Sequence, residues 1–414
     1  MSLILKILNN DKLIVVTNQV AVSGTTFLTN IIMVALCGVS IFGAFSAWQI
    51  AVMLVLALQI AVLSQPMQVF LGKKNAEEIK QYSASVHFMQ LVFILLLAFG
   101  FIAFNTISGM FQRELSYAFA FFASMQLAQE HLRRYLIAKG KLKIALLSDL
   151  ISSLGQLIVL SLFWVQSISP TLIQLFLTIG GTTLPAIVLS LISERRTFQH
   201  RAELIKYVKE HWISARWLVP TALIQWGAAN YLLAASAVIA GNAVLGVLRL
   251  AQTTMGIFNV AIQGLENYFL PYLSRLISNS VDEALQFTFR MIRKIGLLTA
   301  PILILAAIFS SQILSFINTE YVAYASLLRW CCLLYIIILS SFPVKLFIRV
   351  LGDSRHYFIG YAISMTASVL CAQWLIEQWN AVGVVMGWLL SQVLINLYWT
   401  IIITKTKQLS WTLK

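Results

Sequence analysis

The sequence predicts an all-α polytopic membrane protein with about twelve transmembrane helices. Of its 414 residues 59% are apolar and only 11% are charged, with a mean hydropathy of +0.84. A soluble domain is about one quarter charged. The apolar residues form continuous segments of about 20 residues, as membrane-spanning helices require, and do not alternate as in transmembrane strands. The charged residues gather between these segments.

The first apolar stretch contains two spans. Between Lys12 and Lys73 lie 60 residues without Asp, Glu, Lys or Arg, which is enough for two helices, and residues 37–40 (CGVS) provide the turn between them. Applied to the whole chain, the same pattern predicts spans at 13–36, 41–66, 84–106, 115–131, 144–164, 170–192, 217–239, 244–270, 295–315, 322–344, 357–376 and 382–403.

The basic residues predict the orientation of these spans. With both termini cytoplasmic, 26 of the 29 Lys and Arg residues fall in cytoplasmic connections, as the positive-inside rule requires. Arg113 is external, and Arg249 and Arg329 lie within spans. The formal net charge of +14 therefore reports topology, and no nucleic-acid partner is needed to explain it.

The longest hydrophilic stretch divides the chain into two halves. Residues 193–216 carry apolar side chains at helical spacing among basic ones, a pattern typical of an interfacial cytoplasmic linker helix; these are Phe198, Leu204, Ile205, Val208 and Trp212. We expect six-helix bundles at 1–192 and 217–414. An even span count gives both the same orientation, so a pseudo-two-fold axis along the membrane normal would relate them.

No catalytic or metal site is predicted. The chain has no Walker A motif, and its five histidines are scattered without a nucleophile, carboxylate pair or ligand cluster beside them. The connections are too short for a soluble catalytic domain. A membrane-embedded polymerase of polysaccharide assembly is thereby disfavoured, and we expect a transporter without a resident cofactor.

One polar stripe marks a candidate substrate site in the eighth span. Its members follow each other at steps of three or four residues, which places them on one face of a helix: Arg249, Gln252, Gly256, Asn259, Gln263 and Glu266. Such a face lines a polar cavity or packs tightly against a neighbouring helix. The charges near its two ends favour the cavity, because an ionisable group within a span is costly unless it is used.

Other polar residues extend this hypothesis. Arg329 in span 10 is a second cation for an anionic ligand, unless its side chain simply reaches the outer interface. Asn30 and Asn230 are expected to line the contact between the halves, where transporters built from repeats bind their substrates. Glu266 and Asp149 are the candidates for H⁺ or Na⁺ coupling; for Asp149 an ion pair with Lys143 is the alternative.

Several short motifs resemble a known group of transporters. They are residues 11–14 (DKLI), 23–30 (SGTTFLTN), 42–45 (FGAF), 65–67 (QPM), 246–252 (GVLRLAQ) and 265–271 (LENYFLP). The chain resembles the polysaccharide transporters, or Wzx-type oligosaccharide flippases, of the multidrug/oligosaccharidyl-lipid/polysaccharide (MOP) exporter superfamily. The resemblance covers nearly the whole chain and implies a MATE-like arrangement of helices.

The resemblance also implies a function. Such flippases move an undecaprenyl-pyrophosphate-linked oligosaccharide, for example an O-antigen unit of lipopolysaccharide, across the bacterial cytoplasmic (inner) membrane by alternating access. Membrane lipids and polysaccharide assembly proteins are the partners implied. Arg249 and then Arg329 would bind the pyrophosphate, since guanidinium groups suit bidentate contacts with phosphate oxygens, and Gln252, Asn259 and Gln263 would contact the glycan.

Two departures bear on related functions. Multidrug-extruding relatives commonly carry an acidic residue in span 1 or 7, and neither span has one here. The lipid II flippase branch usually has fourteen spans, whereas this chain has room for twelve. A cation-coupled small-molecule exporter of the same superfamily is the alternative function.

Overall fold

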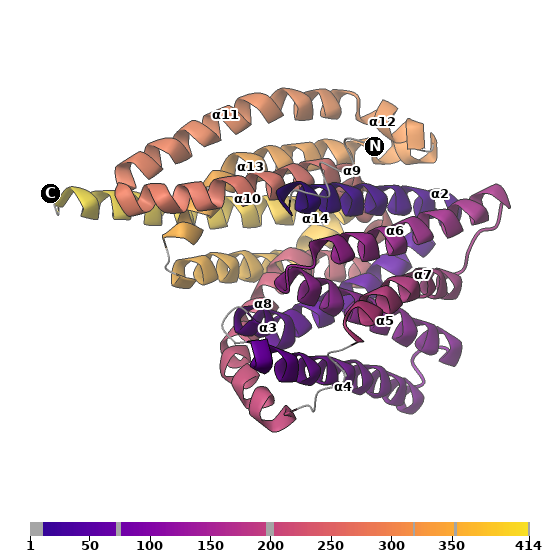
Figure 1. The fold of residues 1–414 in the computed structure, drawn as a ribbon. Helices are drawn as coiled ribbons and strands as arrows, with labels where there is room; N and C mark the ends of the chain where they lie inside the picture. Colours follow the sequence, from indigo (N-terminus) through magenta and orange to yellow (C-terminus); the bar gives the residue numbers. More distant parts are fainter. Residues whose placement is uncertain (1–10, 72–75, 196–202, 318, 352–353, 413–414) are drawn as a thin grey trace, which may run out of the picture. The chain divides into compact units, whose positions relative to one another are not determined.

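The computed structural model describes residues 11–71, 76–195, 203–317, 319–351 and 354–412, and every regular element in these ranges is a helix (Figure 1). The α-helices are α2 (Asp11–Gln59), α3 (Gln65–Leu71), α4 (Ala76–Ser108), α5 (Arg113–Ala138), α6 (Leu142–Val165), α7 (Leu172–Ser193), α8 (Leu204–Ile239), α9 (Asn242–Thr254), α10 (Gly256–Asn279), α11 (Val281–Ile308), α12 (Ser310–Ile317), α13 (Ala325–Val350) and α14 (Ser354–Thr412). A π-helix, η1 (Ile60–Ser64), and a 3₁₀-helix, η3 (Thr319–Tyr324), complete the set.

The helices have the lengths and apolarity of a multi-pass membrane protein. Within the described residues, 8 helical segments are long and apolar enough to cross a membrane. Two of them, Ala21–Leu71 and Arg355–Thr404, have 51 and 50 residues, about twice the length of one crossing. The remaining predicted spans, the fourth and the eighth, fall on α5 and on α9 with α10. The predicted all-α membrane fold is confirmed.

Each double-length segment is broken where the sequence predicts a connection between spans. In α2 the break is at Gly38, with φ 71° and ψ 172°, inside the predicted turn at 37–40. In α14 it is at Asn380, with φ 49°, between the spans predicted to end at 376 and to begin at 382. Glycine reaches positive φ without steric cost, and asparagine tolerates it better than most residues.

The chain divides into two compact units. Unit 1 comprises residues 1–41 and 48–223, and unit 2 comprises residues 42–47 and 224–414. Residues 204–216, expected to form a separate linker helix, are the first part of the continuous helix α8. The rest of the expected linker includes residues 196–202, with Phe198, which lie outside the described residues. The termini expected on the cytoplasmic side, 1–10 and 413–414, lie outside them as well.

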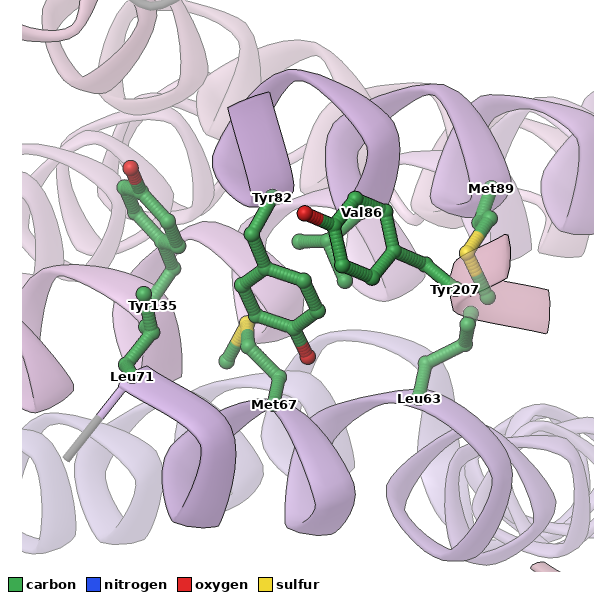
Figure 2. Close-up of a cluster of buried hydrophobic side chains, with 8 residues drawn as sticks. All are labelled: Leu63, Met67, Leu71, Tyr82, Val86, Met89, Tyr135 and Tyr207. Atoms are coloured by element: carbon green, nitrogen blue, oxygen red, sulfur yellow. The ribbon is translucent and has the colours of Figure 1, made fainter. Parts of the chain in front are cut away.

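A buried cluster holds the first part of α8 in unit 1 (Figure 2). The cluster joins side chains from η1, α3, α4, α5 and α8: Leu63, Met67, Leu71, Tyr82, Val86, Met89, Tyr135 and Tyr207. The rings of Tyr82 and Tyr207 meet edge to face, with centroids 5.0 Å apart, a favoured geometry for aromatic pairs. This packing makes the start of α8 part of unit 1.

His211 of α8 contacts a backbone carbonyl of unit 1 that lacks its usual helical hydrogen bond. Pro66 has no N–H for the Val62 carbonyl four residues earlier. His211 lies 2.9 Å from that carbonyl through Nδ1, and its Nε2 lies 2.7 Å from the Tyr82 hydroxyl. The two contacts fix one neutral tautomer, in which Nδ1–H donates to Val62 and Nε2 accepts from Tyr82. A side chain of α8 therefore bonds the carbonyl that Pro66 leaves without its usual backbone donor.

A buried carboxylate ties the ends of α5, α6 and α7 together. Glu194 follows α7 and forms ion pairs with Lys139 at 3.0 Å and Lys141 at 2.5 Å. Its side chain is only 2% exposed. Burial by itself raises the pKa of Glu194, but the hydrogen bonds from Lys141 and Lys139 outweigh this effect and lower the pKa below its usual value.

We predict that Glu194→Gln destabilises the protein at neutral pH by about 1–3 kcal/mol, because it removes a charge that is bonded to two lysines. A carboxylate whose pKa is lowered on folding stabilises the protein above its unfolded pKa, and this stabilisation is lost as pH falls through the folded pKa. The difference in unfolding midpoint in detergent between wild type and variant should therefore shrink as the pH is lowered below about 4.5. A difference that stays constant down to pH 3 would contradict the assignment.

In unit 2 the two halves of α14 approach so closely that only glycine fits at one position. A Cβ atom on Gly383 would collide with the backbone carbonyl of Leu375, on the other side of the break at Asn380. By contrast, Gly100 on α4 has open space where a Cβ would lie. The tight connection in α14 thus requires two residues: Gly383, which has no Cβ, and Asn380, which adopts a positive φ.

We predict that Gly383→Ala lowers the stability of the protein by about 1–3 kcal/mol, the usual cost of overpacking. Gly100→Ala is the matched control and should be neutral or stabilising, because alanine is the better helix former. Thermal unfolding in detergent compares the two variants. Equal midpoints for both would refute the close approach within α14.

Candidate functional site

The predicted polar stripe of span 8 lies in unit 2 on two helices, not one. α9 ends at Thr254 and α10 begins at Gly256, with Met255 between them at φ −80° and ψ −4°. The single helix expected over 244–270 was therefore wrong. Thr253, Thr254 and Gly256 are weaker helix formers than the residues before them, which explains the position of the break. Discontinuous helices of this kind form binding sites in several transporters.

Arg249 lies on α9 among buried aliphatic side chains. The residues next to it, Leu248 and Leu250, are buried, and the arginine itself is partly buried. α9 packs against α13 and α14 of the same unit. The Arg249 guanidinium donates from Nη1 to Gln252 Oε1 at 3.2 Å. The first two residues of the predicted stripe thus act together, with the neutral glutamine orienting the cation.

Asn259 pairs with a tyrosine of α13. Its Nδ2 donates to the Tyr335 hydroxyl oxygen at 2.9 Å, and that hydroxyl lies 3.2 Å from Oδ1 of the same amide. Tyr335 is only 7% exposed, whereas Asn259 is exposed. α10 therefore presents an amide that is fixed from behind by α13 and remains accessible. Tyr335 was not predicted, because a tyrosine in an apolar span gives no signal of its own.

Glu266, at the far end of the stripe, forms an ion pair with Arg349 of α13. Their side chains are 23% and 43% exposed, so the pair is half-buried. Arg349 was predicted only as a cytoplasmic charge, and its pairing with Glu266 was not predicted because the two residues are 83 positions apart in the sequence. The carboxylate proposed for ion coupling thus has a cationic neighbour within its own unit.

Two other predicted site residues of unit 2 make contacts that do not involve Arg249 or Asn259. Arg329 is exposed near the start of α13 and donates from Nε to the Ser310 hydroxyl at 3.1 Å. Asn230 on α8 donates to the backbone carbonyl of Trp226 in its own helix at 3.1 Å. The backbone of Gln263 belongs to α10, but its side chain lies outside the described residues. None of the contacts in the described part of unit 2 joins Arg329 to Arg249.

Two predicted residues belong to unit 1. Asn30 is partly buried on α2. Asp149 is buried on α6 at 3% exposure, and its charge acts on the guanidinium of Arg133 on α5. An ion pair with Lys143 was the alternative considered for Asp149, whereas this interaction is with a cation on a neighbouring helix.

Unit 1 also contains buried polar pairs that the sequence did not indicate. His87 on α4 and His131 on α5 lie with Nδ1 and Nε2 3.0 Å apart. Gln90 donates from Nε2 to Gln59 Oε1 at 3.0 Å, and Gln59 donates to the Leu127 carbonyl at 3.1 Å. Each partner comes from a different helix, so only the fold could reveal them. Among the described residues no group of three His, Cys, Asp or Glu side chains is placed to hold a metal ion.

Solved membrane transporters share this fold over nearly the whole chain. A multidrug resistance MATE family transporter of the MOP superfamily, in an inward-facing conformation, aligns over 96% of both chains with a TM-score of 0.69 and 12% identity. The lipid II flippase MurJ, in an inward closed conformation, aligns over 95% of this chain and 87% of its own, with a TM-score of 0.69 and 14% identity.

A third structure, a MOP superfamily transporter from Pyrococcus furiosus with a binding pocket of reverse polarity, aligns over 96% of this chain and 97% of its own (TM-score 0.60, 11% identity). No protein-family model and no curated protein sequence matches the chain. The chain therefore has the fold of MOP superfamily transporters, which confirms the predicted MATE-like architecture. The similar proteins are transporters and a flippase, not enzymes.

We predict that the Glu266–Arg349 pair contributes about 0.5–1 kcal/mol of coupling energy, the range for ion pairs of this exposure. Arg349→Gln should lower stability in the wild-type background and have a smaller effect in the Glu266→Gln background, because the partner charge is then already absent. A double-mutant cycle on unfolding midpoints measures the coupling. Additive effects of the two substitutions would show that the carboxylate and the guanidinium do not interact.

Proposed function

We propose that the protein is a flippase that moves an undecaprenyl-pyrophosphate-linked oligosaccharide from the cytoplasmic to the outer leaflet of a bacterial cytoplasmic membrane by alternating access. The observation that carries the proposal is Arg249, a partly buried cation on the short helix α9, six residues before the break at Met255 in the predicted eighth span. Retaining a cation at such a place is costly. A ligand with phosphate groups supplies a reason for it.

The chemistry of the residues beside the break fits this substrate class. A guanidinium carries five N–H donors in a planar fork that matches phosphate oxygens bidentately. Gln252 holds this group through one hydrogen bond, which reduces the conformational entropy lost on binding. The amide of Asn259, fixed by Tyr335, is a donor and acceptor suited to sugar hydroxyls. Arg329, exposed and bonded to Ser310, is the weaker candidate for the anionic group.

A lipid-linked substrate is supported by the fold of the lipid II flippase MurJ. The alternative is a cation-coupled exporter of small molecules, supported by the multidrug resistance MATE transporter, which has the same TM-score of 0.69. Glu266 and Asp149 would be its coupling residues. The ion pair of Glu266 with Arg349 weighs against it, because this carboxylate already has a cationic partner within its own unit. The flippase is therefore preferred.

We predict that Arg249→Ala reduces translocation of the lipid-linked oligosaccharide at least tenfold, as expected when one charge-assisted contact worth about 1.5–3 kcal/mol is lost. Translocation is measured in proteoliposomes as the appearance of a fluorescent polyprenyl-pyrophosphate oligosaccharide in the opposite leaflet. Arg249→Lys, which keeps the charge without the planar fork, should retain part of the rate.

Arg293→Ala is the matched control, because it removes an exposed arginine from α11 and should leave the rate unchanged. A wild-type rate in Arg249→Ala would refute the site. Extrusion of a cationic dye by the wild type, lost in Glu266→Gln, together with no flipping of the glycolipid, would replace the flippase by the exporter.

A further inference from the structure

Unit 1 contains a cavity of about 680 Å³ between α4, α5 and α7. Its volume is within the range of about 300–1,000 Å³ for small-molecule sites. We call it the α4–α5–α7 groove; it is lined by Ala84, His87, Phe88, Gln90, Leu91, Ile94, Ala128, His131, Leu132, Ile187, Leu191, Ile192 and Arg195. All of these residues are in unit 1, whereas Arg249 is in unit 2.

The walls of the groove suit hydrocarbon. Nine of the thirteen lining residues are Ala, Leu, Ile or Phe. The membrane-spanning part of α4 is the least buried of the candidate spans in the described residues, at 6%. Leu91 on α4 and Ile192 on α7 are 51% and 61% exposed. An apolar groove that opens at such a surface meets lipid chains and not water, so its occupant carries a hydrocarbon chain.

One end of the groove is cationic. Arg195, which directly follows α7 and Glu194, is exposed and forms no ion pair with a residue that the structure describes. Glu194 is already paired with Lys139 and Lys141. Together with Arg195, these residues carry three positive charges and one negative charge, so this end of the groove has a net positive charge. This end belongs to the connections predicted to be cytoplasmic. A phosphate group is the anion that a membrane offers there.

A polar pair lies within the otherwise apolar groove. The imidazoles of His87 and His131 are hydrogen-bonded to each other at 3.0 Å. His131 is only 2% exposed, and its Nδ1 has no hydrogen-bond partner in the described part of the chain. If His87 Nδ1–H donates to His131 Nε2, the neutral His131 carries its proton on Nδ1. That N–H is suited to an ester carbonyl of a glycerolipid, and leaving it unbonded is costly.

We propose that the α4–α5–α7 groove binds one anionic phospholipid, with the phosphate against Arg195 and an acyl chain along the apolar walls. The proposal is independent of the proposed function, because it concerns a site in the other unit and a lipid that is not transported. A lipid bound in the groove would contact its apolar walls, Arg195 and the His131 Nδ1 atom. It would thereby stabilise the packing of α4 on α5 and α7.

The test is retention of phospholipid by the purified full-length protein, measured by native mass spectrometry after incubation with equal amounts of phosphatidylglycerol and phosphatidylcholine. We expect one phosphatidylglycerol to be retained about fivefold better than phosphatidylcholine, the preference expected of one cation near a lipid phosphate. Arg195→Ala should abolish this preference. Arg293→Ala, which removes an exposed arginine in unit 2, should preserve it.

A second variant tests the apolar part. Ala128→Trp places a large ring in the groove and should reduce retention of both lipids, whereas Leu298→Trp, at a position that is 71% exposed on α11, should not. Thermal unfolding in lipid-free detergent identifies variants that fail to fold. If Ala128→Trp does not fold, the lipid preference of Arg195→Ala tests the proposal by itself. Equal retention of the two lipids by the wild type, or an undiminished preference in Arg195→Ala, would overturn the proposal.

Discussion

The structure depends on one constraint: inside a bilayer, every backbone N–H and C=O must find its partner within the protein. Helices satisfy it in their regular turns, and three of the interruptions in the described residues can be assigned to particular residues. Gly38 and Asn380 turn the chain in the left-handed region. Behind the π-helix η1, His211 supplies the donor that Pro66 lacks.

The same constraint decides where charge is found. Ionisable groups inside spans are costly, and two of those predicted there have specific neighbours: Glu266 is paired with Arg349, and Arg249 is bonded to Gln252. The break between α9 and α10 lies between Arg249 and Glu266 and separates the two charged ends of the stripe onto different helices. Polar side chains and irregular backbone thus occur together, as expected for a site that binds a polar group in a membrane.

The sequence predicted the helices well because the bilayer fixes their length and apolarity. A run of 60 charge-free residues needs two crossings, and Gly38 was the natural turn between them. The prediction failed where a local weakness competed with a continuous apolar pattern, as at Met255 in the expected span 244–270. Contacts between residues far apart in the sequence, such as His87 with His131 or Glu266 with Arg349, could not be predicted, because a single sequence does not indicate which side chains pair across helices.

The central claim is that a cation beside the break in span 8 recognises the pyrophosphate of a lipid carrier. The most direct measurement compares, in the same proteoliposomes, one oligosaccharide linked to polyprenyl pyrophosphate with the same oligosaccharide linked to an uncharged polyprenyl ether. Our account predicts that the wild type moves the pyrophosphate-linked form at least tenfold faster, and that Arg249→Gln removes most of this preference. Equal rates for the two carriers in the wild type would contradict it.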